Sequence, residues 1–439
     1  MKLTRKVHLL GGAHTPFVGK FHPDFIWKGH PDFGKRENPT LEDYTQKPAI
    51  EALAEAGLAP KDVDKGFVGN FAGELFSQQG HLGAVLASAH PDLDGKPLSR
   101  VEGACASGGL AVLAGVDAIQ AGADVVLVVG SEVQTTVSAK QGAEYLARAA
   151  HFRTQRSIDP FTFPCLFARR TKLYKEAFGL EDADLAKVVA KAYANASKNP
   201  YAHMRAYKMT EEMAREASDK NPFFLENAEW KQHLKVSDCS QVSDGGSAIV
   251  LVSDAGLKKA RKRPQDAILL AGYGHATGRI EGPKDFLELE TTKRAAKAAY
   301  ESTGISPGHV SVAEVHDCFS ICELLMLEAL GFAEKGEAKK LVREGQNRVE
   351  GKIPVNTGGG LLAFGHPVGA TGVKQTYEIF RQMKRRCGGY QIPGKVKIGV
   401  AANMGGDDRT SVVTLWANPE NARPEDETAA ILAAILATF

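Results

Sequence analysis

The chain lacks several features that mark special classes of protein. Its six cysteines have no regular spacing, which excludes both a disulfide framework and a zinc-binding pattern and fits a reducing compartment. It has no apolar run of membrane-spanning length and no signal-peptide pattern at its start, so we expect a cytoplasmic protein without a membrane span. A net charge of only +2 argues against a nucleic-acid-binding protein held by bulk electrostatics. With 439 residues, 43% of them hydrophobic, the chain has the composition of a soluble enzyme with two or three lobes.

One cysteine stands in an unusual setting. Cys105 lies among small residues (Gly103 to Gly109), and an Ala-rich apolar segment that reads as a buried helix follows and ends at Gly122. Free backbone N–H groups and the helix dipole at such a position favour the reactive thiolate. The simpler alternative is a small buried cysteine packed in a turn.

Two parts of the chain resemble each other. Residues 55–63 resemble residues 302–310, and each copy runs from a helix end into a strand. Ala106-Ser107-Gly108 and Ala370-Thr371-Gly372 each precede a helix and then a strand, at 125–130 and 396–402. Helices alternating with apolar strands predict two copies of an α/β unit with at least partly parallel sheets.

The region 140–240 differs from both copies. It is charged, aromatic and poor in strand patterns, which predicts an inserted helical and loop subdomain. We therefore divide the chain into 1–139 (completed by 241–280), 140–240, 281–416 and a tail, 417–439, with a short apolar helix candidate at 429–436. The basic side chains of the insertion form either a solvated face or a surface for a phosphorylated ligand; they are Arg148, Arg153, Arg156, Arg169, Arg170 and Lys172.

A second irregular segment, 19–40, is rich in Gly, Pro, His and aromatic residues. Its His-Pro-Asp-Phe sequence occurs twice, but the histidine spacing fits no metal-ligand pattern. A loop or a subunit contact is therefore the favoured interpretation.

Two further loops carry chemistry. His316-Asp317-Cys318-Phe319 ends a strand of the second copy, where residues two apart share a face. A Gly-rich loop, 358–372, contains His366. Each motif alone is weak, but nucleophilic cysteine chemistry needs a base near the thiol and oxyanion donors, and the duplication can bring both histidines near Cys105.

Together, Cys105-Ala106-Ser107, His316-Asp317-Cys318-Phe319 and Gly365-His366-Pro367 resemble the fingerprints of the thiolase superfamily, over about residues 3–416. The His-Asp-Cys-Phe form is similar to that of the sterol-carrier-protein-2-type thiolases. The resemblance implies an α/β thiolase fold: duplicated halves with mixed five-stranded sheets in a layered α-β-α-β-α arrangement, plus an inserted loop domain.

The resemblance also implies an activity. The chain is expected to be an acetyl-CoA C-acyltransferase of lipid metabolism that acts in fatty acid degradation. It would cleave 3-oxoacyl-CoA, or condense acyl groups in reverse, through an acyl-cysteine. Coenzyme A would be a co-substrate, with no permanent cofactor and no metal. By resemblance, His366 activates Cys105 and Cys318 moves the α-proton. His316 and His366 hold one oxyanion, the N–H groups of Cys105 and Gly405 the other, and Ser240 lies near the pantetheine arm.

One departure and several alternatives remain. Asn403 stands where most thiolases carry a second reactive cysteine, which Cys318 would replace, and Asp407-Asp408 is less usual than glycines. A homodimer or homotetramer is implied. The alternatives are a thiolase-fold retro-aldolase or acyltransferase working with a small partner protein, and a non-catalytic acyl-CoA-binding protein.

Overall fold

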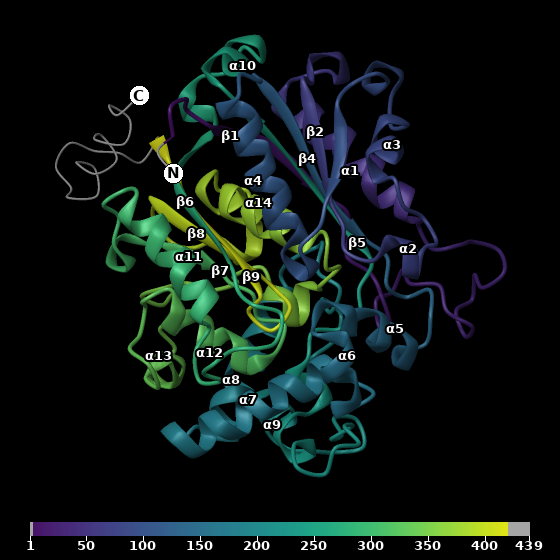
Figure 1. Ribbon diagram of the computed structural model, residues 1–439, viewed down its shortest axis with the longest axis vertical. Coiled ribbons are helices and arrows are strands. Elements are labelled where there is room, and N and C mark those ends of the chain that lie inside the picture. Colours follow the sequence, from purple (N-terminus) through teal and green to yellow (C-terminus); the bar gives the residue numbers. More distant parts are fainter. Residues whose placement is uncertain (1–2, 420–439) are drawn as a thin grey trace.

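The computed structural model describes residues 3–419 and contains one mixed sheet of nine strands, in the order β3-β2-β4-β5-β1-β6-β9-β8-β7 (Figure 1). The first half contributes β1 (His8–His14), β2 (Lys65–Gly69), β3 (Leu98–Val101), β4 (Val125–Glu132) and β5 (Gly245–Val252). The second half contributes β6 (Ile268–Thr277), β7 (Val312–Glu314), β8 (Ile398–Gly405) and β9 (Thr410–Ala417).

Both halves use the same pairing. β2 is parallel to β4, β4 is antiparallel to β5, and β5 is antiparallel to β1. In the second half β7, β8, β9 and β6 repeat this succession. The expected duplication of an α/β unit is therefore confirmed at the level of strand pairing.

The expectation of two five-stranded sheets needs a correction. Short pairing of His8 with Leu269 and of Leu9 with Ile268 joins β1 to β6, so the halves share one sheet. In the second half the place of β3 is taken by one isolated parallel bridge, between Ala313 and Val355.

The reason for the missing strand is local. Pro354 has no N–H to donate, and Asn356 has a left-handed backbone (φ 52°), so the chain cannot continue as a strand. The Asn356 side chain completes the ladder instead: it accepts from the N–H of Val315 and donates to its carbonyl, at 2.8 and 3.2 Å.

Three layers of helices cover the sheet. α1 (Leu41–Ala56), α3 (Leu82–Ala87) and α10 (Asp254–Lys259) pack outside the first half. α4 (Ser107–Gln120) and α14 (Thr371–Met383) pack against each other between the halves, and α11 (Glu290–Glu301) and α12 (Ser320–Ala329) lie outside the second (Figure 1). Along β4, alternate valines face the central and the outer core. Along β8, Ala401 faces the same central core, while Val400 and Ala402 face the core on the other side of the sheet. Both halves of the sheet therefore lie between helix layers, which confirms the expected α-β-α-β-α layering.

The region between β4 and β5 is helical and irregular. It carries α5 (Ala139–Leu146), α6 (Phe152–Gln155), α7 (Thr162–Phe178), α8 (Asp182–Ala196) and α9 (Glu211–Arg215). Two short helices lie elsewhere, α2 (Gly73–Phe76) and α13 (Ala338–Arg343). The domain boundaries derived from the sequence stay predictions, and the helix predicted at 429–436 lies outside the described residues.

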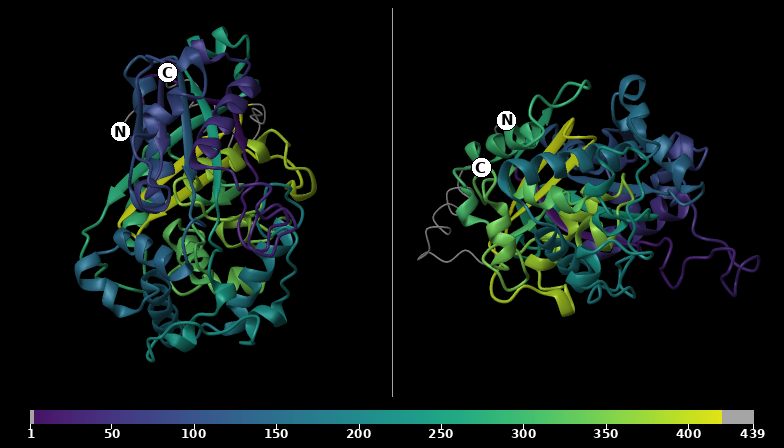
Figure 2. Two further views of the ribbon diagram at one scale, coloured as in Figure 1. Left: turned by 90° about the vertical axis from the view of Figure 1, so that its right-hand side faces the viewer. Right: turned by 90° about the horizontal axis from the view of Figure 1, so that it is seen from below.

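Residues 19–40 form no helix or strand, and part of this long loop extends away from the body (Figures 1 and 2). This agrees with the loop interpretation. Among residues 3–419, no helix combines the length and the apolar character that crossing a bilayer requires.

Candidate active site

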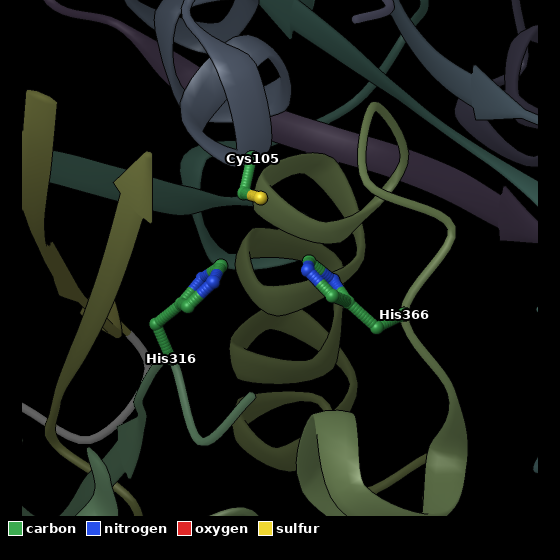
Figure 3. Close-up of side chains that lie close together, drawn as sticks. All are labelled: Cys105, His316 and His366. Atoms are coloured by element: carbon green, nitrogen blue, oxygen red, sulfur yellow. The ribbon is translucent and has the colours of Figure 1, made fainter. Parts of the chain in front are cut away.

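Three segments that are distant in the sequence place Cys105, His316 and His366 around one point. Cys105 lies in a 3₁₀ turn, Ala104–Ala106, that leads into α4. His316 follows β7, and His366 follows a π-helical turn, Gly360–Phe364, before α14. The thiol sulfur and one nitrogen of each imidazole all lie within 4.8 Å of one another, and both rings point toward the sulfur (Figure 3).

These side chains line a cavity of about 440 Å³, to which Cys318 and Ser240 also contribute. Lys20 and Phe25 of the 19–40 loop contribute to its wall as well. Most of the remaining wall is apolar and comes from α5, the start of α7 and neighbouring loops, including Phe71, Phe76, Val137, Gly142, Leu146, Phe161, Phe163, Phe167 and Phe319.

The Cys105 thiol is not a resting thiolate. Burial raises its pKa to about 12, and the negative charge of Glu132 adds to this. The N–H groups of Gly406 and of Cys105 itself act in the opposite direction but are outweighed. The expectation that the helix start favours the thiolate is therefore wrong for the resting site. The free energy lost when the buried anion gives up its water is larger than the stabilisation that these two N–H donors provide.

The N–H that faces the Cys105 sulfur belongs to Gly406, not to Gly405. Gly405 is the last residue of β8, and a Cβ there would lie 2.2 Å from the Gly103 carbonyl oxygen. Gly406 begins the turn to β9 with a left-handed backbone (φ 64°), which favours glycine at this position, and it lines the cavity.

The unusual Asp407-Asp408 pair holds this turn. Asp407 Oδ1 accepts from the Arg170 Nε at 2.6 Å, with both side chains buried. Asp408 accepts from the N–H groups of Thr291 and Thr292 at 2.7 and 3.0 Å, in the first turn of α11. The Gly406 turn is thus fastened on one side to α7 and on the other to α11.

His366 is a neutral base in the resting site. Burial, helped by the charge of Lys374, lowers its pKa to about 3. Its Nδ1 lies 2.7 Å from the Thr371 Oγ1, and that hydroxyl donates its single proton to the Pro367 carbonyl at 3.1 Å. Thr371 therefore accepts from Nδ1–H, and the free lone pair of His366 is on Nε2.

His316 is neutral as well. Burial lowers its pKa well below 6.5, and His366 and Lys374 add to this effect. The two imidazoles meet edge to face, with ring centroids 5.0 Å apart. The Nδ1 of His316 lies 3.1 Å from Nδ2 of the buried Asn403.

Cys318 lines the same cavity as a protonated thiol. Burial raises its pKa well above the usual value, and its neighbour Cys322 contributes, with the two sulfurs 3.8 Å apart. Its carbonyl accepts from the Ser240 N–H at 2.9 Å, so the predicted pantetheine residue is tied to the Cys318 backbone. β7 ends at Glu314, so this motif lies in the loop between β7 and α12.

The basic residues of the insertion do not form one phosphate-binding face. Arg170 is fully buried in its pair with Asp407, and Arg169 stacks on Phe286 at 3.8 Å from the ring centroid. Lys172 lies within 4 Å of glutamates on the surface of this region. The sequence offered two interpretations of these residues, a solvated face or a surface for a phosphorylated ligand, and both are wrong for Arg170.

The sequence reasoning missed several supporting residues. Glu132, at the end of β4, accepts from the N–H groups of Phe71, Ala72 and Gly369 and so connects β4 to two loops beside the cavity. A carboxylate that directly follows an apolar strand was the available signal. Thr371 lies in the repeated Ala-Thr-Gly sequence, which pointed to a helix start but not to a histidine partner.

Comparisons with known proteins agree with one another. The family model "Thiolase, N-terminal domain" matches residues 32–255, and "Thiolase C-terminal domain-like" matches 272–418. The acetyl-CoA acetyltransferase of Methanothermobacter thermautotrophicus is 33% identical over 87% of this chain and 96% of its own length. Sterol carrier protein 2 of Bos taurus is 30% identical over 88% of this chain and 70% of its own. A solved "Ltp2-ChsH2(DUF35) aldolase" superposes with a TM-score of 0.73 at 21% identity, covering 95% of this chain and all of that one.

Proposed function

The chain belongs to the thiolase family and is an acyltransferase of that family, and we propose that it exchanges acyl groups between coenzyme A and 3-oxoacyl-CoA through a thioester on Cys105. The observation that carries the proposal is the pairing of a protonated Cys105 with the neutral His366. An unprotonated base beside a thiol is what formation of a sulfur nucleophile requires.

In the cleavage direction, His366 takes the Cys105 proton as the sulfur attacks the 3-oxo carbon. The bond between the α- and β-carbons then breaks, and the acyl group stays on Cys105 as a thioester. The departing carbanion of acetyl-CoA takes the proton of the Cys318 thiol, whose high pKa keeps that proton available. The thiol of a second coenzyme A attacks the thioester and gives its proton to the Cys318 thiolate. The Cys105 thiolate that leaves takes back the proton held by His366, so all three groups return to their starting states. Condensation is the same sequence in reverse.

Two sets of donors stabilise the charge that develops on carbonyl oxygens. His316 and protonated His366 serve the thioester oxygen of the carbanion. The N–H of Cys105 and that of a glycine at the β8–β9 turn serve the oxygen on the carbon attacked by Cys105. The N–H of Gly406, which faces the sulfur, supports a role for Gly406, and the role of Gly405 stays a prediction. Ser240 lines the cavity beside Cys318, which supports the proposal that it contacts the pantetheine arm.

The direct test is to trap the covalent intermediate. The protein is incubated with acetoacetyl-CoA in the absence of free coenzyme A. The mass of the intact protein is measured, and protease digestion then locates the modified peptide. An added acetyl group on the peptide containing Cys105, absent in Cys105→Ala and kept in Cys165→Ala, is expected, because Cys165 is a buried thiol outside the cavity. An acetyl group that persists in Cys105→Ala would contradict the proposal.

A second candidate is an acyltransferase or retro-aldolase that needs a partner protein. The 19–40 loop exposes three large aromatic side chains, Phe21 (52%), Trp27 (59%) and Phe33 (56%). Lys20 and Phe25 of the same loop line the cavity. Thiolysis by the purified chain alone would reject this candidate. Light scattering of the same sample would test a separate prediction, the homodimer or homotetramer. The cytoplasmic location and the role in fatty acid degradation stay predictions.

A further inference from the structure

Asn403 lies where three elements of the site meet. It belongs to β8, only 3% of it is exposed, and its side chain enters the space between the starts of α4 and α14. A Cβ on Gly109 or on Gly372 would lie 2.8 or 2.4 Å from its Oδ1. The two glycines therefore leave the room that this amide fills.

The hydrogen bonds of the Asn403 side chain determine which of its two terminal atoms is the oxygen and which is the nitrogen. Its Oδ1 accepts from the backbone N–H of Gly109 at 3.0 Å, and its Nδ2 donates to the carbonyl of Cys105 at 3.0 Å. A backbone N–H can only donate and a backbone carbonyl can only accept, so both contacts require the same orientation. The remaining proton of Nδ2 points at Nδ1 of His316, 3.1 Å away.

This orientation fixes the proton of His316. An amide nitrogen donates and does not accept, so the Nδ1 of His316 must offer a lone pair. Because the ring is neutral, its single proton is on Nε2. Thr371 imposes the opposite choice on His366, whose proton is on Nδ1.

We propose that Asn403 is a positioning residue that holds His316 as the Nε2–H tautomer, so that one histidine presents a donor and the other presents a base to the same reacting group. The consequence for catalysis rests on the proposed thiolase reaction; the tautomer itself does not. Through its bond to the Cys105 carbonyl, the same amide fixes the backbone of the nucleophile relative to that donor. In this tautomer the Nε2 of His316 carries the proton and has no lone pair to offer a metal ion, while its Nδ1 is bound by Asn403. The group of Cys105, His316 and His366 is therefore arranged for oxyanion binding rather than for a metal ion.

The test exchanges the donor for an acceptor at nearly constant volume. In Asn403→Asp, one carboxylate oxygen still accepts from Gly109, while the other faces the Nδ1 of His316 and draws the proton to it. The readout is the pair of imidazole ¹⁵N signals of protein labelled in histidine, with His316 assigned by the loss of its signals in His316→Gln. We expect a protonated Nε2 in the wild type and a protonated Nδ1 in Asn403→Asp. The kcat for thiolysis should fall by roughly 100- to 1000-fold, as for the loss of one oxyanion donor, with KM changed by less than about threefold.

The outcomes separate the inference from the proposed function. A protonated Nδ1 in the wild type would overturn the inference, as would a tautomer change in Asn403→Asp that leaves kcat unaltered. Should Asn403→Asp fail to fold, Asn403→Ala is read instead, and a single unchanged Nε2–H tautomer there would also overturn it. A wild type that shows the Nε2–H tautomer but cleaves no 3-oxoacyl-CoA supports the role of Asn403 and rejects the proposed function.

Discussion

Replacing His366 with asparagine tests whether the site makes its nucleophile only with the help of this base. Asparagine keeps a polar group of similar size but cannot take a proton. Without a base, Cys105 must ionise into solvent, and a thiol with a pKa of about 12 is ionised in about one molecule in 10⁴ at pH 8. We therefore expect Cys105 acylation in His366→Asn to be slower by a factor of roughly 10³ to 10⁴, within the range known for general-base catalysis.

The pH dependence gives the sharper signature. Wild-type His366, with its pKa of about 3, is already neutral throughout the range from pH 6 to 9, so its acylation rate should be nearly flat there. In His366→Asn the rate should rise about tenfold per pH unit, because it follows the thiolate fraction. Rapid-quench measurement of acyl-Cys105 by mass spectrometry gives both rates, and His8→Asn is the control, since His8 is a buried histidine outside the cavity lining.

Two results would refute this reasoning. A loss of less than about tenfold in His366→Asn would mean that another group takes the proton of Cys105. A flat pH profile in the variant would mean that the thiol is already ionised, so that burial does not control its pKa.

Three further predictions concern the other parts of the site and the fold. Cys318→Ala should still transfer acyl groups from CoA to Cys105, but exchange of the α-protons of acetyl-CoA with D₂O should fall by roughly 10² to 10⁴; unchanged exchange would remove Cys318 from proton transfer. Asp407→Asn should lower both kcat and the free energy of unfolding, the latter by about 3 kcal/mol, because it leaves the buried charge of Arg170 without its carboxylate partner; a urea midpoint and kcat equal to those of the wild type would contradict the anchoring role of this pair. Each buried histidine with a pKa of about 3 to 4 should lower stability as the pH drops from 6.5 toward 4, because in that window the unfolded chain binds a proton that the histidine does not; the histidines are His14, His203 and His366. Buried carboxyls with raised pKa values, such as Glu132 at about 7 and Asp244 at about 6, act in the opposite direction, so the contribution of His203 is measured as the difference in free energy of unfolding between the wild type and His203→Gln. That difference should fall by at most about 1.4 kcal/mol per pH unit, and a difference that is constant from pH 7 to 4 would argue against it.

Much of the architecture was predictable because it is local or repeated. The helix at 41–56 has a capping box at Thr40 and Asp43 and ends at Gly57, whose left-handed backbone (φ 74°) stops it, so short-range signals were sufficient. The duplication predicted matching strands, and the pairing of both halves follows it. The segment around Val355 shows where prediction from the repeat fails. Pro354 and the left-handed backbone of Asn356 keep this segment from pairing as a full strand, and the repeat in the sequence does not reveal this.

For the candidate site, the sequence by itself singled out the residues that we propose to react. Cys105, His316, Cys318 and His366 stand in motifs whose residue types already limit what they can do, and their order along the chain pointed to the family. Their ionisation was decided only by the tertiary structure. A helix start favours a thiolate, but the free energy of removing water from a buried anion depends on every segment packed around it, and burial raises the pKa of Cys105 to about 12.

The tertiary structure also decided the direction of each donor. Gly405 and Gly406 are equivalent in sequence terms, yet only Gly406, in the turn held by Asp407 and Asp408, aims its N–H at the sulfur. Asn403 looked like the loss of a thiol, and its contacts with Gly109, Cys105 and His316 exist only because α4, β7 and β8 meet there. Hydrogen bonds between distant segments leave no regular spacing in the sequence. The sequence therefore indicated the groups proposed to react, and only the fold determined which of their atoms carry protons.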